Sequence, residues 1–187
     1  MHDFKYSPTK KITFEIYPNL ESFHHAINWP TAPDWLIGQT SIDTIQRVSP
    51  HNPGPYHTYE SVMTFITSMY NHHDSIPRWL HQGVALYKAE FFSKNVSEKF
   101  ALHISSPTLQ QLEAIAKDDT TAFDELDGFR VSYSLVQFID HGWGWESILD
   151  VLEDYSQFEE ILNINKELFI QLWKEYILSL HSTDQHC

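Results

Sequence analysis

Apolar residues near the N-terminus recur at every second position. Ile12, Phe14 and Ile16 alternate with more polar neighbours, and Pro18 follows them. This period of two predicts a strand that buries one face. A helix and two extended segments should follow, over residues 20–27, 35–40 and 42–48. The chain is therefore expected to begin with a small β-sheet and one helix.

A loop rich in proline divides this part from the rest of the chain. Residues 49–56 hold three prolines and one glycine, which disfavour regular structure. After the loop, from about Thr58, the apolar spacing becomes that of an amphipathic helix packed on a sheet. Its buried stripe should consist of Val62, Phe65, Ile66, Met69 and Tyr70.

The remaining sequence predicts a mainly helical second half. Helices should start near Pro77 and Ser106, and three more should cover residues 129–140, 145–152 and 165–180. The apolar stripe of the last helix should consist of Leu168, Leu172, Trp173, Tyr176 and Leu180. The acidic stretch over residues 118–127 lacks the spacing of a calcium loop, and we interpret it as a solvated turn.

The chain has the length of one domain. Its 187 residues are enough to bury a substantial core. We expect a single domain over residues 1–187, with the sheet and its central helix in residues 11–71 and a helical part in residues 72–180.

Composition and charge exclude several classes of partner. Lys and Arg number 12 against 25 Asp and Glu, a formal charge of −13, so nucleic acid and anionic membranes should be repelled. No stretch approaches the ~20 apolar residues of a membrane span. The one cysteine, Cys187, leaves no intrachain disulfide. We expect a cytoplasmic protein, and the sequence leaves its oligomeric state open.

Common catalytic motifs are missing from the sequence. The six glycines form no phosphate-binding loop, and there is no G-x-S-x-G elbow. A Ser–His–Asp triad cannot be recognised from spacing alone, so that class of enzyme stays open.

Five stretches of the sequence, taken in order, point to a known family. They are KITFEIYPNLESFHHAI (residues 11–27), APDWLIGQT (32–40), IQRVSPHNPGP (45–55), IPRWLHQGVALY (76–87) and SYSLVQFID (132–140). Their order and the Pro-Arg-Trp-Leu element resemble the gluzincin-type peptidase MA family of metallopeptidases. The resemblance implies a zincin-like α+β fold, in which a small N-terminal sheet packs on the former active-site helix and a mainly helical C-terminal half follows.

The resemblance also implies a zinc motif that this chain has lost. Active relatives carry H-E-x-x-H on the helix before the Pro-Arg-Trp-Leu element. Its two His coordinate zinc, and its Glu is the general base. A Glu of the next helix is the third ligand. The corresponding positions here are Thr64, Phe65, Ser68 and Gln82, none of which suits either role. Residues 58–71 contain no His at all, so a shift of register does not restore the motif.

The resemblance thus predicts a catalytically inactive metallopeptidase homologue without a zinc cofactor, whose cleft binds a peptide or protein partner if it has a function. The alternative is an active metal-dependent hydrolase with relocated ligands. His72, His73 and His81 are the candidates, with Asp74 as a further candidate, although adjacent His72 and His73 can chelate together only from a loop.

Five further residues are open to a structural or a functional interpretation. Tyr133 is either an oxyanion donor at the cleft or a core tyrosine. Arg78 and Trp79 are interpreted as a charge at the rim of the lost metal pocket and an aromatic anchor beneath it. His24 and His25 are expected on the polar side of the first helix.

Overall fold

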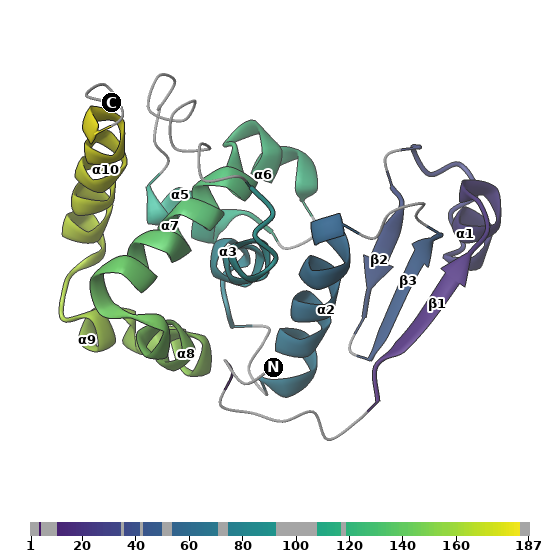
Figure 1. The fold of residues 1–187 in the computed structure, drawn as a ribbon, viewed down its shortest axis with the longest axis horizontal. Coiled ribbons are helices and arrows are strands. Elements are labelled where there is room, and N and C mark those ends of the chain that lie inside the picture. Colours follow the sequence, from purple (N-terminus) through teal and green to yellow (C-terminus); the bar gives the residue numbers. More distant parts are fainter. Residues whose placement is uncertain are drawn as a thin grey trace.

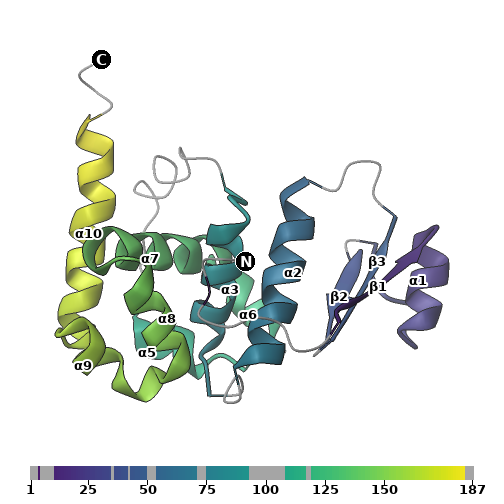
Figure 2. The ribbon, with the colours of Figure 1, turned by 60° about the horizontal axis from the view of Figure 1, so that its bottom comes forward.

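A small sheet lies at one end of the molecule, and helices form the rest (Figure 1). The computed structural model describes residues 4, 11–34, 36–41, 43–49, 54–70, 75–92, 108–116 and 119–183. Helix α2 (Gly54–Met69) stands between the sheet and the other helices in both ribbon views (Figures 1 and 2). The arrangement is α+β, as the sequence predicts.

The sheet has three strands in the order β1-β3-β2. Strand β1 (Thr13–Tyr17) runs parallel to β3 (Thr44–Val48), and β2 (Gly38–Thr40) runs antiparallel to β3. Helix α1 (Leu20–Ala26) lies on the side of the sheet away from α2 (Figure 2). Asn19 caps α1, because its side-chain oxygen accepts a hydrogen bond from the Ser22 amide at 2.9 Å. The predicted elements are therefore present, although β2 and β3 are shorter than expected.

The predicted buried face of β1 is wrong. Phe14 and Ile16 are 40% and 61% exposed. In the strand register they lie beside Ile45 and Arg47 of β3, which are buried. Helix α2 packs against β2 and β3, whereas β1 is an edge strand beyond its reach. The apolar side chains of β1 point to the correct face, but the helix does not cover them.

Helix α2 begins earlier than the sequence predicts. It starts at Gly54 and holds Pro55 in its first turn, where a proline loses no helical hydrogen bond. The predicted loop is therefore wrong at its C-terminal end. The predicted stripe is confirmed at Val62, Phe65, Ile66 and Tyr70. Met63 and Thr64 are buried as well, because α2 is covered by the sheet on one side and by helices on another.

A buried ion pair joins the sheet to α2. Arg47 Nη1 donates to Glu60 Oε2 at 2.7 Å, and the two side chains are only 5% and 9% exposed. Gly38 makes room for this pair, since a Cβ there would lie 2.6 Å from Glu60 Oε1. Burial raises the pKa of Glu60, and the charge of Arg47 opposes that rise. Each charge therefore depends on the other to remain in the interior.

Two helices cross closely in the helical part. These are α3 (Arg78–Lys88) and α7 (Gly128–Trp143). A Cβ on Gly83 of α3 would lie 2.4 Å from the carbonyl oxygen of Ser132 and 2.8 Å from Val136 Cγ2. The side chains around the crossing are fully buried, among them Leu80, Val84, Leu135 and Val136. Only a glycine permits this backbone contact.

Five further helices complete the described part of the chain. They are α5 (Leu109–Ala114), α6 (Thr120–Glu125), α8 (Trp145–Glu153), α9 (Phe158–Leu162) and α10 (Lys166–Thr183), with a 3₁₀ turn at Tyr155–Gln157. The predictions for α7, α8 and α10 are confirmed. Helix α5 is present with Thr108 as its N-cap, whereas its predicted start at Ser106 lies outside the described residues. No helix in the described ranges is both long enough and apolar enough to cross a membrane.

Two helices differ from the predictions in instructive ways. The acidic stretch contains α6 rather than only a turn, because Asp119 caps it through the Ala122 amide at 2.9 Å. In α10, Leu168 is 44% exposed, and the fully buried residues are Phe169, Trp173 and Ile177. The buried stripe has the predicted helical period, but it is rotated toward Phe169.

Removing Arg47 alone should destabilise the protein. Arg47→Met leaves the Glu60 carboxylate buried without a partner, which should cost about 3–5 kcal/mol at pH 7. The folded-state pKa of Glu60 lies above its unfolded value. Ionisation of buried Glu60 therefore lowers the free energy of unfolding as pH rises through that pKa. The free energy lost in Arg47→Met should accordingly be smaller at pH 5 than at pH 8. Urea unfolding at pH 5 and pH 8 measures both effects.

The matched control for this prediction is the double variant Arg47→Met/Glu60→Leu, which removes both charges. It should recover most of the lost free energy of unfolding, because an apolar pair needs no compensation. A loss that is independent of pH, or that the double variant fails to recover, would contradict the described ion pair.

Gly83→Ala should destabilise the helical part. The added methyl group meets the backbone of α7 rather than a movable side chain, so the expected loss is about 1–3 kcal/mol or slightly more. Gly142→Ala is the matched control, since no atom lies within 4 Å of a Cβ at that position of α7. It should gain up to about 1 kcal/mol from helix propensity. Equal unfolding midpoints for the two variants would show that α3 and α7 are not in contact at Gly83.

Candidate functional site

The positions predicted to correspond to the zinc motif lie on α2 and α3, which pack against each other. Thr64 and Phe65 are both fully buried. The ring of Phe65 lies 4.8 Å from that of Phe4 and belongs to the main hydrophobic core. Ser68 is part of α2, and its side chain lies outside the described atoms. Phe65 therefore acts as a core residue at the position where relatives are expected to carry a base.

The polar residues of α3 face one stripe of α2. The side-chain oxygen of Gln82 accepts a hydrogen bond from the Tyr59 hydroxyl. His81 Nε2 lies 3.3 Å from the carbonyl oxygen of Met63 and 3.4 Å from Thr67 Oγ1. Residues 59, 63 and 67 are spaced by four and share one face of α2.

Thr64 belongs to a different face of the same helix. It follows Glu60 by four residues and therefore shares the side that Glu60 turns toward the sheet. Tyr59 is about 140° away from Thr64 around the helix. The described contacts thus bring Gln82 to Tyr59 and do not bring it to Thr64.

The hydroxyl of Thr64 is buried without a hydrogen-bond partner in the described part of the structure. An unpaired buried hydroxyl costs free energy, because it loses its bonds to water and gains none in return.

Only one of the three His candidates for a relocated metal site belongs to the described residues. His72 and His73 lie outside the described residues. His81 is half-buried and has the contacts given above. Within the ranges that the structure describes, no three metal-ligating side chains come together.

Tyr133 lies in the interior, with a side chain only 7% exposed. Its ring meets those of Tyr87 and Phe92 edge to face, with centres 5.7 Å and 5.4 Å apart. Burial raises the pKa of the Tyr133 hydroxyl above its ordinary value, so the group stays neutral. These contacts favour the interpretation of Tyr133 as a core tyrosine.

Two predicted surface positions are wrong. Arg78 is buried rather than at a rim, with its guanidinium carbon 4.5 Å from the centre of the Phe123 ring and Nη2 donating to Thr120 Oγ1 at 3.1 Å. His24 is buried, and its Nε2 lies 2.9 Å from the carbonyl oxygen of Leu36. His25 is exposed, as predicted. Trp79 is fully buried, and its placement beneath a former metal pocket stays a prediction.

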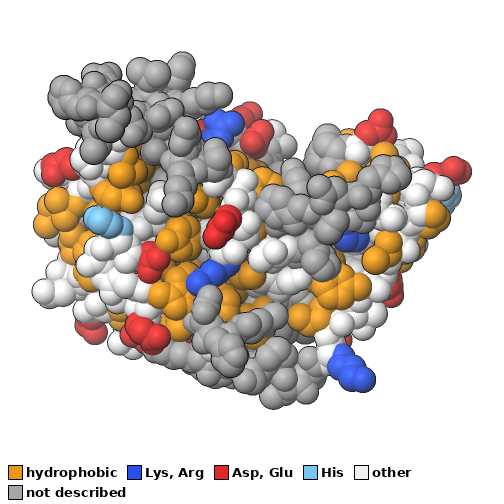
Figure 3. Space-filling model, in the orientation of Figure 1, with side chains coloured by type: hydrophobic (Ala, Val, Ile, Leu, Met, Phe, Trp, Pro, Cys, Tyr) orange, Lys and Arg blue, Asp and Glu red, His pale blue; other side chains and the backbone are white. Residues whose placement is uncertain are grey.

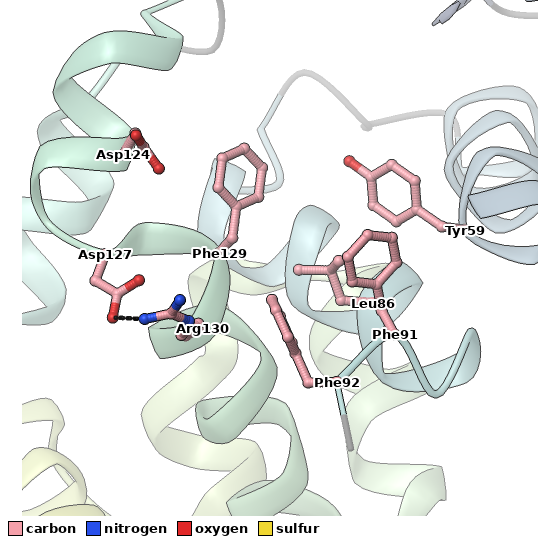
Figure 4. Close-up of a pocket in the computed structure, with 8 residues that line it drawn as sticks. All are labelled: Tyr59, Leu86, Phe91, Phe92, Asp124, Asp127, Phe129 and Arg130. Atoms are coloured by element: carbon pink, nitrogen blue, oxygen red, sulfur yellow. Dashed lines mark hydrogen bonds and ion pairs between the residues drawn. The ribbon is translucent and has the colours of Figure 1, made fainter. Parts of the chain in front are cut away.

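An aromatic pocket of about 380 Å³ adjoins the Gln82 position. Figure 4 shows its residues: the rings come from α2, from the end of α3 and from the start of α7, and charged side chains stand at one end. The lining consists of Tyr59, Leu86, Phe91, Phe92, Asp124, Asp127, Phe129 and Arg130. Tyr59 is shared, because it lines the pocket and also donates to Gln82.

Two left-handed residues shape this aromatic pocket. Glu90 has φ of 48°, and the Phe91 amide donates back to the Leu86 carbonyl at 3.0 Å, which closes α3 and turns Phe91 and Phe92 toward the pocket. Asp127 has φ of 52° and starts α7. A left-handed backbone is uncommon for residues other than glycine, and such residues are often found at functional sites.

The charged end of the aromatic pocket carries two carboxylates and one guanidinium. Arg130 Nη1 lies 3.4 Å from Asp127 Oδ2, and both side chains are about half exposed. Burial raises the pKa of Asp127, Arg130 opposes the rise, and Asp124 adds to it. No described cation pairs with Asp124. The sequence analysis did not find this pocket, since its residues come from three separate segments.

The chain matches no protein-family model, no curated protein and no solved structure. The resemblance to the peptidase MA family therefore stays a prediction. The functional proposal depends on that resemblance and on the geometry described above.

Thr64→Val should stabilise the protein by about 1 kcal/mol, because it removes an unpaired buried hydroxyl at nearly constant volume. Thr67→Val is the matched control on the same helix. The Thr67 hydroxyl donates to the Met63 carbonyl at 2.9 Å, so its loss should cost up to about 1 kcal/mol. Thermal melts of both variants test the difference in sign. Destabilisation by Thr64→Val would mean that the Thr64 hydroxyl has a partner in solution.

Proposed function

We propose that this protein is a catalytically inactive homologue of the metallopeptidases, whose function is to bind a peptide or protein segment. The observation that carries the proposal is Phe65, a fully buried core residue at the predicted position of the general base. A general base must reach both a water molecule and the substrate. A ring inside the core does neither.

The surroundings of Gln82 support the same proposal. Gln82 occupies the predicted position of the third zinc ligand, and its oxygen is engaged by the Tyr59 hydroxyl. A neutral amide in an internal hydrogen bond is a poor ligand for zinc compared with imidazole, thiolate or carboxylate. The pair is better suited to hold α2 against α3 than to bind a metal.

The aromatic pocket supports the binding part of the proposal. Its volume of about 380 Å³ lies in the range of small-molecule sites, and it has apolar walls with charged groups at one end. It adjoins the Gln82 position through Tyr59. One large apolar side chain of a partner fits such a space.

An active hydrolase with relocated ligands is the alternative from the sequence. Of its three His candidates only His81 is described, and its Nε2 is turned to the backbone oxygen of Met63 within the α2–α3 contact. No observation favours this alternative over a binding function.

Two measurements test the proposed function. Elemental analysis of the purified protein should find no stoichiometric zinc, and added zinc should produce no peptide cleavage that a chelator inhibits. Peptides selected from a random display library should carry a large apolar side chain. Their affinity, measured by titration calorimetry, should fall at least threefold in Phe129→Leu.

Trp29→Leu is the matched control, because Trp29 is 49% exposed and does not line the aromatic pocket. It should leave peptide affinity unchanged. Stoichiometric zinc together with chelator-sensitive cleavage would refute the proposed function, and an equal loss of affinity in both variants would place the peptide elsewhere.

A further inference from the structure

We propose that the aromatic pocket selects an organic cation, namely an ammonium group that carries an apolar substituent. The substituent lies among the rings of Tyr59, Phe91, Phe92 and Phe129, and the ammonium lies at the end of the pocket near Asp124. This inference rests on the proposed binding function and gives the chemistry of the ligand.

The rings provide the first argument. The centres of Tyr59 and Phe91 are 5.9 Å apart and those of Phe91 and Phe92 5.3 Å apart, both in edge-to-face pairs. Together with Phe129, these three rings line the pocket. Aromatic faces are negative and attract cations within about 6 Å of the ring centre. Figure 4 shows Phe129 between these rings and the charged end of the pocket.

The charges provide the second argument. Arg130 compensates one of the two carboxylates through its contact with Asp127. Asp124 is exposed on α6 and has no cationic partner among the described residues. The lining therefore carries a net charge of −1, from two carboxylates and one guanidinium. This charge favours a cation over a neutral or anionic ligand of the same shape, and the chain charge of −13 assists its approach. Acidic side chains are spread over the visible face of the molecule (Figure 3).

In a second cavity a lysine of the chain itself lies beside one of the carboxylates. This cavity has a volume of about 600 Å³, lies between α5 and α10, and its lining includes Glu113, Glu167 and Lys166. Lys166 Nζ donates to Glu113 Oε1 at 2.8 Å and lies 4.9 Å from the centre of the Tyr155 ring. The chain itself thus places the ammonium of Lys166 beside a carboxylate of that cavity and near an aromatic ring. In the aromatic pocket, the corresponding position beside Asp124 is left to a ligand.

The experiment uses three probes of nearly equal size on the full-length protein: 2-phenylethylamine, 2-phenylethanol and phenylacetate. Titrations at pH 7 followed by protein NMR give a Kd for each probe and the position of the shifts. The amine, protonated at this pH, should bind at least threefold more tightly than the alcohol, and phenylacetate should bind most weakly. The shifts should include the amides of Phe91, Phe92 and Phe129.

Two charge variants separate the role of Asp124 from a general effect of charge. Asp124→Asn should raise the Kd of the amine to that of the alcohol and leave the Kd of the alcohol unchanged. Glu125→Gln removes an equal charge from the next exposed position of α6, which does not line the pocket, and should change neither Kd. Equal binding of amine and alcohol to the unmodified protein, or an equal effect of the two variants, would overturn the proposal.

Further probes identify the source of the ammonium. Phenylalanine amide represents a peptide N-terminus, Nα-acetyl-lysine amide represents a lysine side chain with a free ε-ammonium, and 2-phenylethylamine represents a free amine. The probe that binds most tightly, and loses that advantage in Asp124→Asn, assigns the source. Failure of this inference is distinct from failure of the proposed function. If library peptides bind while no probe shows a preference for a cation, only the inference is refuted. Stoichiometric zinc with chelator-sensitive cleavage refutes the catalytic inactivity in the proposed function, and the probe titrations still decide whether the pocket prefers a cation.

Discussion

The close contact of α3 with α7 at Gly83 is the constraint on which the helical part depends. Because the backbone of α3 meets that of α7 at Ser132, the two helices are held in one relative position. The positions of the C-terminal end of α3 and the N-terminal end of α7 are thereby fixed as well. Helix α3 closes at the left-handed Glu90, and α7 starts after the left-handed Asp127. The aromatic pocket lies between these two helix ends, and α2 contributes Tyr59 as a further wall.

The sheet is joined to this helical part in a different way. Its connection to α2 depends on the ion pair of Arg47 with Glu60, which is buried against Gly38. Removing one partner of a buried ion pair leaves an unpaired buried charge, which costs more stability than an apolar substitution that conserves volume. Helix α2 covers the central strand and leaves Phe14 and Ile16 of the edge strand exposed. The sheet is thus joined to α2 along β2 and β3, and its outer edge carries exposed apolar side chains.

Thr64 and Gln82, two positions predicted for the zinc motif, do not meet because they belong to different contacts of α2. Glu60 and Thr64 belong to the side toward the sheet, whereas Tyr59, Met63 and Thr67 meet α3. The sequence places Thr64, Phe65 and Gln82 on two neighbouring helices, and that placement agrees with the structure. The sequence does not reveal which face of α2 meets Gln82, because the contact depends on how the helices are rotated in the folded chain.

Local patterns in the sequence are enough to predict the type of most elements and much of the core. The stripe of α2, the cap at Asn19 and the bounds of α7 and α8 follow from spacing and local hydrogen bonds, which act within a few residues. Which apolar residues are covered depends on how the elements pack, as Phe14 and Leu168 show. It also decided the partner of Glu60 and the assembly of the aromatic pocket. These features join residues that are far apart in sequence, so their geometry depends on how the elements pack together, which local pattern does not contain.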